Sequence, residues 1–127
     1  MHLWDKNSKN LTDFATYFSF GIDSQIQTKY ADGLAIFLTP NGFKTSIAAS
    51  AGSLGLCNSA SNSISNRFVA VEFDIFSTEW DPPGEHVGID INSLKSVANV
   101  SWLSNNTIMG GNHIMKLGLV TILFHKI

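Results

Sequence analysis

The sequence predicts an all-β protein, built as a sandwich or a jelly roll. Several short apolar segments alternate with small polar side chains, as half-buried strands do, and turn residues separate these segments. At 127 residues, the chain is long enough for one domain with a hydrophobic core and too short for two ordinary domains. Short strands joined by turns are typical of sandwiches and jelly rolls.

The first half of the chain contains two predicted strands. Residues 14–22 alternate apolar and small polar side chains, which predicts a half-buried strand. Residues 34–38 are apolar and predict a mostly buried strand, which ends at the turn-forming residues 39–42. Residues 44–66 are rich in Ser, Ala, Asn and Gly and predict a loop region, interrupted by the apolar residues 54–57.

The second half contains the strongest strand prediction of the chain. Residues 68–76 alternate faces and are rich in β-branched and aromatic side chains. Residues 86–91 predict another strand, with its aliphatic side chains on one face. Residues 97–103 predict a further strand, and no internal repeat is present.

An acidic strand and the loop that follows it predict a divalent-metal site. Glu72 and Asp74 are two residues apart on the strand, so their side chains point to the same face. Asp81 and His86 belong to the proline-containing loop that follows, and can return to meet them. Three carboxylates and one imidazole at one place are typical of a site for a divalent cation.

The types of ligand allow two adjacent ions. Ca²⁺ takes about six to eight oxygen ligands, whereas Mn²⁺ accepts carboxylates, water and an imidazole. His86 would therefore bind the transition-metal ion, with Asp74 and Asp81 bridging to a calcium ion that the backbone carbonyl of Phe76 also contacts. The alternative is an acidic strand face open to water. A cluster of carboxylates repels itself, which favours a bound cation over this alternative.

The same strand allows a second interpretation, as part of a jelly-roll glycoside hydrolase. Such enzymes carry the motif Glu-x-Asp-x-x-Glu, which places a nucleophile and an acid on one strand face. In this chain Ser77 stands where the second glutamate is needed, and Glu79 is out of register. The required pair of carboxylates is missing, so the sequence predicts no catalytic residue and no enzyme.

Charge and hydropathy bear on the remaining classes of partner. The formal net charge is −2 and no basic stripe is present, so we expect no binding to nucleic acid. The longest apolar run is far shorter than a membrane span, so we expect no transmembrane segment. The first six residues turn polar at once, so we expect no signal peptide in this chain.

Four blocks of the sequence resemble the legume lectin family of plants. These blocks fall in the family's order and spacing, and the resemblance extends over about residues 2–111. The block His-Val-Gly-Ile-Asp-Ile-Asn-Ser resembles plant members, including soluble lectins and the lectin domains of receptor-like kinases. Residues 14–20 and 95–102 also look like the family. The four blocks are residues 31–38, 52–56, 69–76 and 80–93.

The resemblance implies a concanavalin-like jelly-roll sandwich that binds sugars without transforming them. The implied partners are mono- or oligosaccharides and glycoconjugates, and the parent family is extracellular or in the secretory pathway. In the sugar site, Asp32 and the backbone N–H of Gly52 would hydrogen-bond the sugar, and Phe76 would stack on its ring. The Ala–Asp peptide before this aspartate is typically cis in the family.

The resemblance also assigns the metals. Both ions would lie beside the sugar site and would hold its loops in shape. The positions that match Mn²⁺ ligands are Glu72, Asp74, Asp81 and His86, and those that match Ca²⁺ ligands are Asp74, Asp81 and the carbonyl of Phe76.

The first departure from the family is Thr78. The family has an asparagine here, whose amide both ligates calcium and hydrogen-bonds the sugar. One hydroxyl cannot do both, so we predict weaker calcium and sugar binding, by about 1–3 kcal/mol for one lost buried hydrogen bond. The alternative function is therefore a truncated remnant that no longer binds sugar.

The second departure concerns both ends of the chain. We expect residues 1–111 to be a partial legume lectin domain that lacks N- and C-terminal strands, with exposed strand edges that favour aggregation. Residues 112–127 do not resemble the family. The codons of residues 115–123, shifted by one base, permit the family's Ala-x-Ile-x-Tyr-Asn-Ser strand, which indicates a frameshift or splicing error after Gly111. The alternative is a genuine final strand over residues 117–124.

Overall fold

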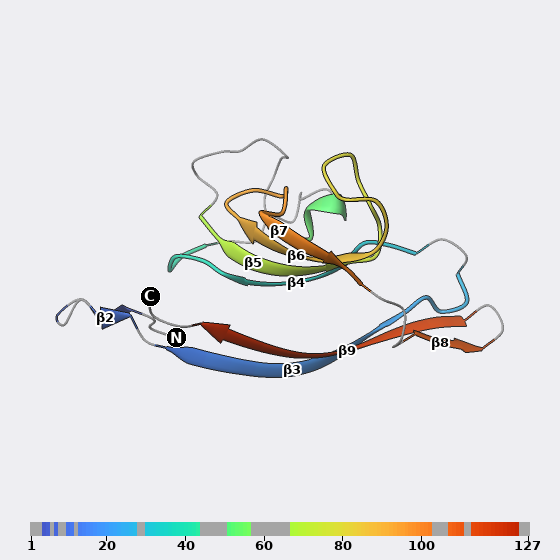
Figure 1. Ribbon diagram of the computed structural model, residues 1–127, viewed down its shortest axis with the longest axis horizontal. Coiled ribbons are helices and arrows are strands. Elements are labelled where there is room, and N and C mark those ends of the chain that lie inside the picture. Colours follow the sequence, from blue (N-terminus) through green and yellow to red (C-terminus); the bar gives the residue numbers. More distant parts are fainter. Residues whose placement is uncertain are drawn as a thin grey trace.

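The all-β prediction is confirmed by the architecture in Figure 1, a computed structural model. The structure describes residues 4–5, 7, 10–11, 13–27, 30–43, 51–56, 67–102, 107–110 and 113–124. These residues form antiparallel strands and one short 3-10 helix, η1 (Ala51–Ser53). Among the residues described, no helix is long and apolar enough to span a membrane.

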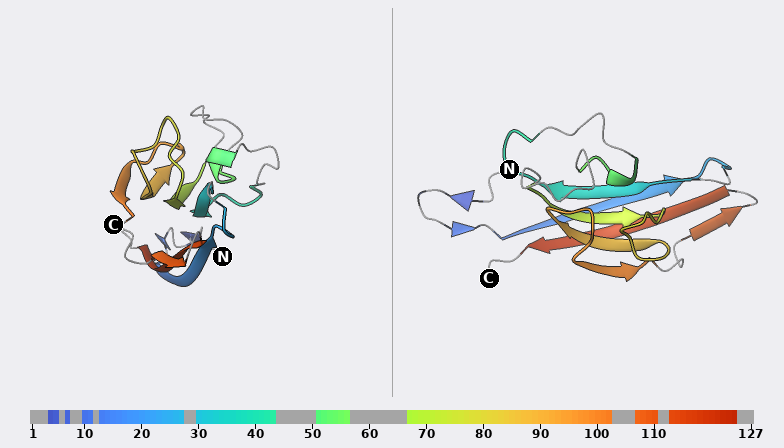
Figure 2. Two further views of the ribbon diagram at one scale, coloured as in Figure 1. Left: turned by 90° about the vertical axis from the view of Figure 1, so that its right-hand side faces the viewer. Right: turned by 90° about the horizontal axis from the view of Figure 1, so that it is seen from above.

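Two antiparallel sheets stack face to face, as the end view in Figure 2 shows. The four-stranded sheet has the strand order β4-β5-β6-β7, and the three-stranded sheet has the order β3-β9-β8. A separate ribbon pairs β1 (Trp4–Asp5) with β2 (Asn10–Leu11). The strands of the four-stranded sheet are β4 (Gly33–Leu38), β5 (Val69–Asp74), β6 (His86–Ile91) and β7 (Ala98–Ser101), and those of the three-stranded sheet are β3 (Phe14–Asp23), β8 (Thr107–Gly110) and β9 (His113–Phe124).

The predicted strands agree with these bounds to within a few residues. The prediction for β6 coincides with the observed strand, and that for β3 stops one residue early. Strand β5 ends at Asp74 rather than at residue 76, because the chain there bends into the loop that leads to β6. Strand β7 is shorter than the predicted 97–103, and residue 103 lies outside the described residues, as do most of residues 44–66.

Aromatic side chains fill the space between the two sheets. The ring of Phe73, on β5, lies 4.8 Å from that of Phe20 and 6.2 Å from that of Phe18, both on β3. The ring of Trp102 lies 5.8 Å from both Phe73 and Phe20. The odd-numbered residues of β5 therefore face the other sheet, and its even-numbered residues must face the opposite side.

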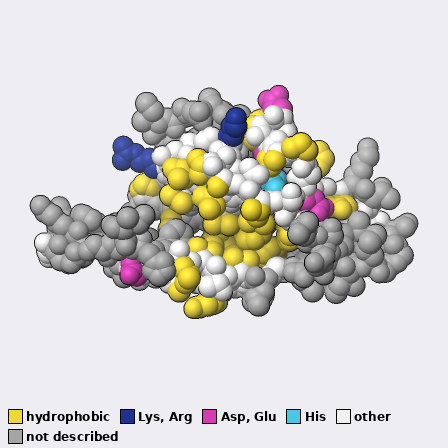
Figure 3. Space-filling view, viewed as in Figure 1, with side chains coloured by type: hydrophobic (Ala, Val, Ile, Leu, Met, Phe, Trp, Pro, Cys, Tyr) yellow, Lys and Arg dark blue, Asp and Glu magenta, His cyan; other side chains and the backbone are white. Residues whose placement is uncertain are grey.

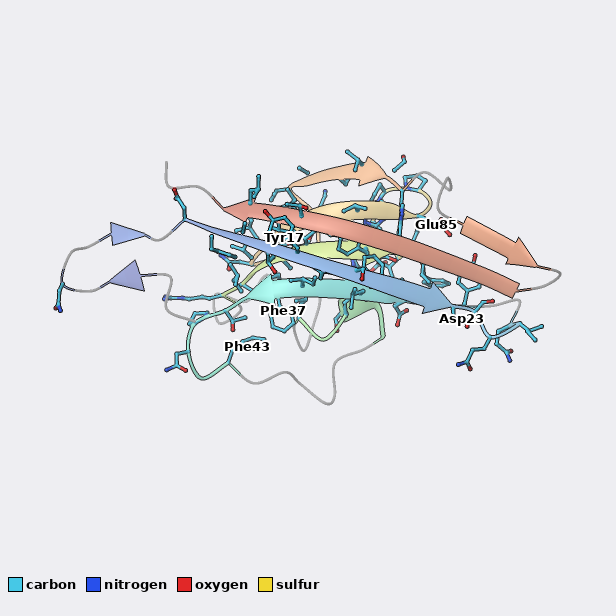
Figure 4. The ribbon with its side chains drawn as sticks, turned by 90° about the horizontal axis from the view of Figure 1, so that it is seen from below. Tyr17, Asp23, Phe37, Phe43 and Glu85 are labelled. Atoms are coloured by element: carbon cyan, nitrogen blue, oxygen red, sulfur yellow. The ribbon has the colours of Figure 1, made fainter. Side chains whose placement is uncertain are left out.

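A second apolar cluster lies on that opposite side, under the loops that Figure 1 shows above the four-stranded sheet. Ala70 on β5 packs there with Leu56, Phe68 and Leu94, all of which are buried. The ring of Phe43 makes an edge contact with that of Phe37 on β4, with centroids 5.8 Å apart (Figure 4). The loops thus form a third layer, and the strand face that carries the candidate metal ligands lies beneath it.

The last described strand lies in the segment that we expected, from the sequence, to differ from the family. Strand β9 pairs with β3 from Phe14 opposite Phe124 to Asp23 opposite Met115. Gly118 admits the ring of Phe20, since a Cβ atom at this glycine would lie 2.3 Å from that ring. The alternative interpretation of the tail, a final strand over residues 117–124, agrees with β9, which begins earlier, at His113.

An apolar groove remains between the sheets where β6 and β7 face β9. Its volume is about 500 Å³, and aliphatic side chains from both sheets line it. Figure 3 shows the hydrophobic side chains that gather between the two layers on this side. Val100 on β7 is 66% exposed and Leu123 on β9 is 57% exposed. The inner faces of the two sheets are therefore only partly covered within the described part of the chain.

Candidate metal centre and sugar-binding surface

The pairing of β5 with β6 brings the predicted metal ligands together. Asp74 lies directly opposite His86, and Glu72 lies opposite Gly88. Paired residues share a face of the sheet, so all three ligand side chains point into the loop layer. One ligand atom from each of Glu72, Asp74 and His86 lies within 4.8 Å of the other two, and all three residues are buried. Asp81 is outside this close group.

Hydrogen bonds orient the imidazole and one of the carboxylates. Nε2 of His86 lies 3.1 Å from Oε1 of Glu72, and the hydroxyl of Ser96 donates to the same oxygen at 2.6 Å. Nδ1 of His86 lies 3.3 Å from the carbonyl oxygen of Gly84. A proton on Nδ1 would donate to this carbonyl, which leaves the lone pair of Nε2 for a metal ion.

Gly88 makes room for this arrangement. A Cβ atom at Gly88 would lie 2.2 Å from the hydroxyl oxygen of Ser96 and 2.4 Å from Oε1 of Glu72. Sequence reasoning missed both Gly88 and Ser96. A glycine inside a predicted strand was the available signal, because such a glycine often marks a close approach of other groups.

Burial destabilises the ionised carboxylates of this cluster. Burial raises the pKa of Asp74 to about 6, the N–H of Phe76 opposes the rise by donating to Oδ1 at 2.6 Å, and the charges of Asp81 and Glu72 raise the pKa further. The pKa of Asp90, which is 0% exposed, rises to about 8 through burial and the neighbouring charge of Glu72. Neither carboxylate oxygen of Asp90 has a hydrogen-bond partner among the described residues. A cation here would lower the electrostatic cost of the buried carboxylates.

The loop between β5 and β6 contains its own hydrogen bonds. Both the backbone N–H and the hydroxyl of Thr78 donate to Oδ2 of Asp81, the former at 2.7 Å. The hydroxyl of Ser77 lies 3.0 Å from the carbonyl oxygens of both Pro82 and Gly84. Asp81 therefore bonds within the loop.

The residues assigned to the sugar site lie around the same end of the four-stranded sheet. The Ala31–Asp32 peptide is cis, as the family resemblance implies. The carbonyl of Asp32 accepts a hydrogen bond of 2.9 Å from the N–H of Ile75, which fixes Asp32 beside the end of β5. The side chain of Phe76, one residue further, is 52% exposed. A large aromatic ring is thus open to a ligand there.

Gly52 lies against the loop that carries Thr78. A Cβ atom at Gly52 would lie 2.9 Å from the methyl carbon of Thr78 and 3.7 Å from the ring of Trp80. The glycine therefore allows η1 to approach the loop closely, which brings Gly52 and Thr78 together. The sequence alone assigns these two residues to one site only through the family resemblance.

Comparisons with known proteins agree with this architecture. The sequence profile described as "Legume lectin domain" matches residues 1–117. The chain is 45% identical to the bark lectin of Styphnolobium japonicum over 103 residues, which cover 80% of this chain and 37% of the relative. It is 41% identical to a lectin-related protein of Cladrastis kentukea over 102 residues, which cover 80% of this chain and 34% of the relative.

Solved structures agree as well. Lectin UEA-II in complex with galactose matches with a TM-score of 0.80 and 33% sequence identity, over 98% of this chain and 51% of that one. The chain thus spans between a third and about half of the length of these proteins. The profile match over residues 1–117 and the match to solved structures lead to one assignment: the chain belongs to the legume lectin family, with that family's jelly-roll β-sandwich fold.

Proposed function

We propose that the chain binds mono- or oligosaccharides, free or on glycoconjugates, and that a bound metal ion holds the binding surface in shape. The observation that carries this proposal is the direct connection between the buried cluster and the exposed surface. Asp74 belongs to the cluster and accepts a hydrogen bond from the N–H of Phe76, whose ring is exposed. No catalysis is part of the proposal, since the relatives named above are lectins.

Each proposed sugar contact uses the chemistry of its residue. The carboxylate of Asp32 accepts hydrogen bonds from two ring hydroxyls, and the N–H of Gly52 donates one. Phe76 covers the apolar face of the ring, which suits its exposed position. Thr78 lies against Gly52, and its hydroxyl donates to Asp81. One of the solved relatives contains galactose, so a galactose-type sugar is the first ligand to test.

The residues present fit a transition-metal ion such as Mn²⁺. Two buried carboxylates and one imidazole within 4.8 Å are a donor set that this class of ion accepts. Glu72, Asp74 and His86 would hold it, with Asp81 the remaining residue of the proposed set. The bound ion supplies positive charge that compensates the buried carboxylates. The proposed Ca²⁺ has fewer suitable donors: Asp74, the carbonyl of Phe76 and Asp81, the last already bonded to Thr78.

Affinity chromatography on galactose, mannose and glucose resins tests the proposal. The chain should be retained after loading with Mn²⁺ and released by EDTA. Asp32→Ala should abolish retention, whereas Asp23→Ala, an exposed aspartate at the end of β3 in the other sheet, should not. A folded chain that no resin retains, with or without metal, would support the alternative of a remnant that has lost sugar binding.

A further inference from the structure

The loop between β5 and β6, residues 75–85, is closed by hydrogen bonds at both of its turns. At the first turn, the N–H of Phe76 donates to Asp74 at 2.6 Å, and Thr78 donates to Oδ2 of Asp81 through both its N–H and its hydroxyl. The N–H of Asp81 also lies 3.4 Å from the carbonyl oxygen of Thr78. Each of the two residues, Thr78 and Asp81, therefore donates a hydrogen bond to the other.

The second turn is closed by Ser77. Its hydroxyl lies 3.0 Å from the carbonyl oxygens of Pro82 and Gly84, and so joins the start of the loop to its end. Gly84 in turn meets Nδ1 of His86, at 3.3 Å. The polar groups that hold this loop thus come from the chain itself.

A calcium ion fits these donors poorly. Calcium requires about six to eight oxygen ligands, several of them from carboxylates. Both hydrogen bonds from Thr78 go to Oδ2 of Asp81, and Asp81 lies outside the close ligand group. The group that remains contains an imidazole, which suits a transition-metal ion and not calcium.

We infer that this chain takes one transition-metal ion, at Glu72, Asp74 and His86, and that the hydrogen bonds between Thr78 and Asp81 replace a calcium ion in ordering the loop. The inference rests on the metal-dependent function proposed above. It specifies the metal requirement of that function as one manganese-type ion, in place of the Mn²⁺ and Ca²⁺ pair that the family resemblance implies.

Metal titration of the intact chain tests this inference. EDTA-treated protein is titrated with MnCl₂ by calorimetry, and the Mn²⁺-loaded protein is then titrated with CaCl₂, while hydrogen exchange reports on the amide of Thr78. We expect one Mn²⁺ per chain, no binding of Ca²⁺, and a Thr78 amide that is protected before any metal is added. Binding of one Ca²⁺ in addition to Mn²⁺, with increased protection of the Thr78 amide, would overturn the inference. A chain that binds no Mn²⁺ would also overturn it.

Three substitutions of Thr78 distinguish the effect of its hydroxyl from the effect of the shape of its side chain. Thr78→Asn supplies an amide oxygen, and should make calcium binding measurable by the same titration, where the native chain shows none. Thr78→Val keeps the shape and removes the hydroxyl, so it should lower amide protection and leave Mn²⁺ binding unchanged. Thr78→Ser keeps the hydroxyl and should behave as the native chain does, even if Thr78→Val fails to fold.

The sugar resins are scored separately, so that the two proposals can fail independently. A chain that binds one Mn²⁺, ignores Ca²⁺ and is not retained by any sugar would refute the proposed function and support the single-ion inference. A chain that is retained by a sugar resin only when both Mn²⁺ and Ca²⁺ are present would support the proposed function and refute the single-ion inference.

Discussion

The outer face of the four-stranded sheet and the inner face of the three-stranded sheet differ in what they bury. Strands β5 and β6 bury Glu72, Asp74, His86 and Asp90 beneath the loop layer. Strand β3 alternates half-buried and exposed residues along its whole length, and its half-buried side includes the rings of Phe18 and Phe20. Specific hydrogen bonds and charge compensation must therefore hold the first face, whereas the second face depends on apolar packing and strand register.

In each sheet, a glycine leaves space that a side chain from another segment occupies, but the side chains differ in chemistry. Gly88 on β6 leaves space that Glu72 and Ser96 occupy, and Gly118 on β9 leaves space that the ring of Phe20 occupies. In one sheet the space holds a polar site, and in the other it holds part of the core. Changes in the first sheet should therefore affect metal binding, and changes in the second should affect stability alone.

The largest effect is expected for Gly88→Ala. The added Cβ atom would meet Ser96 and Glu72. Oε1 of Glu72 accepts the hydrogen bond from Ser96 and lies 3.1 Å from Nε2 of His86. Displacement of these groups should lower the affinity for Mn²⁺ by about 10- to 100-fold, the range seen when groups that orient metal ligands are altered. Calorimetric titration measures this loss.

Gly118→Ala is the matched change in the other sheet. Its Cβ atom would meet the ring of Phe20, so we expect a loss of stability of about 1–3 kcal/mol from overpacking. Affinity for Mn²⁺ should stay unchanged in the fraction that folds. Equal losses of Mn²⁺ affinity in Gly88→Ala and Gly118→Ala would contradict the expectation that only the four-stranded sheet holds the metal site.

A pH-dependent effect of intermediate size is expected from Asp90. Its pKa is raised from 3.8 to about 8 in the folded chain, so between these pH values the folded state binds a proton that the unfolded state lacks. The stability of the metal-free chain should therefore fall as the pH rises from about 4 to 8, and Asp74, with a pKa of about 6, contributes in the same direction.

Urea denaturation in EDTA, at several pH values between 4 and 8, measures this dependence. Asp90→Asn should reduce it, leaving the contribution of Asp74, and should be more stable than the native chain at pH 8. Asp23→Asn, at an exposed position of β3, should leave the pH dependence unaltered. A native chain that gains stability across this range would contradict the assignment.

The smallest effect is expected for Ser77→Ala. The hydroxyl joins the carbonyls of Pro82 and Gly84 at an exposed position, so its loss should cost about 1 kcal/mol or less. Hydrogen exchange should show faster opening in residues 75–85. Ser19→Ala, an exposed serine on β3, is the control and should change neither exchange nor stability of the loop. Identical exchange in Ser77→Ala and native protein would mean that this bond does not hold the loop.

Local patterns predicted most of the strands, because two-residue alternation is set by neighbouring side chains. Strand β6 coincides with its prediction, and β3 differs by one residue. The pairing of β3 with β9 could not be predicted, because it joins residues as far apart as Phe14 and Phe124. Pattern alone also left the tail open between a final strand and a segment foreign to the fold.

The residues of the candidate site likewise divide into those that the sequence pattern predicted and those that it did not. Glu72, Asp74 and His86 were identified from their types and spacing, since carboxylates on one strand face and a nearby imidazole suggest a cation directly. Gly88, Ser96 and Asp90 were missed, because their roles depend on which atoms approach them from another part of the chain. Spacing along one strand does not specify such approaches.

The sequence by itself determined the β-class, the positions of strands β3 to β7 to within a few residues, the types of the candidate metal ligands and the family. Tertiary structure alone decided that Asp81 bonds to Thr78 outside the close ligand group, and that Gly88 leaves the space in which Ser96 meets Glu72. The physical reason is that alternation and ligand chemistry are properties of residues and their neighbours. Strand register and loop closure, by contrast, are set by contacts between distant segments, which exist only once the sheets have formed.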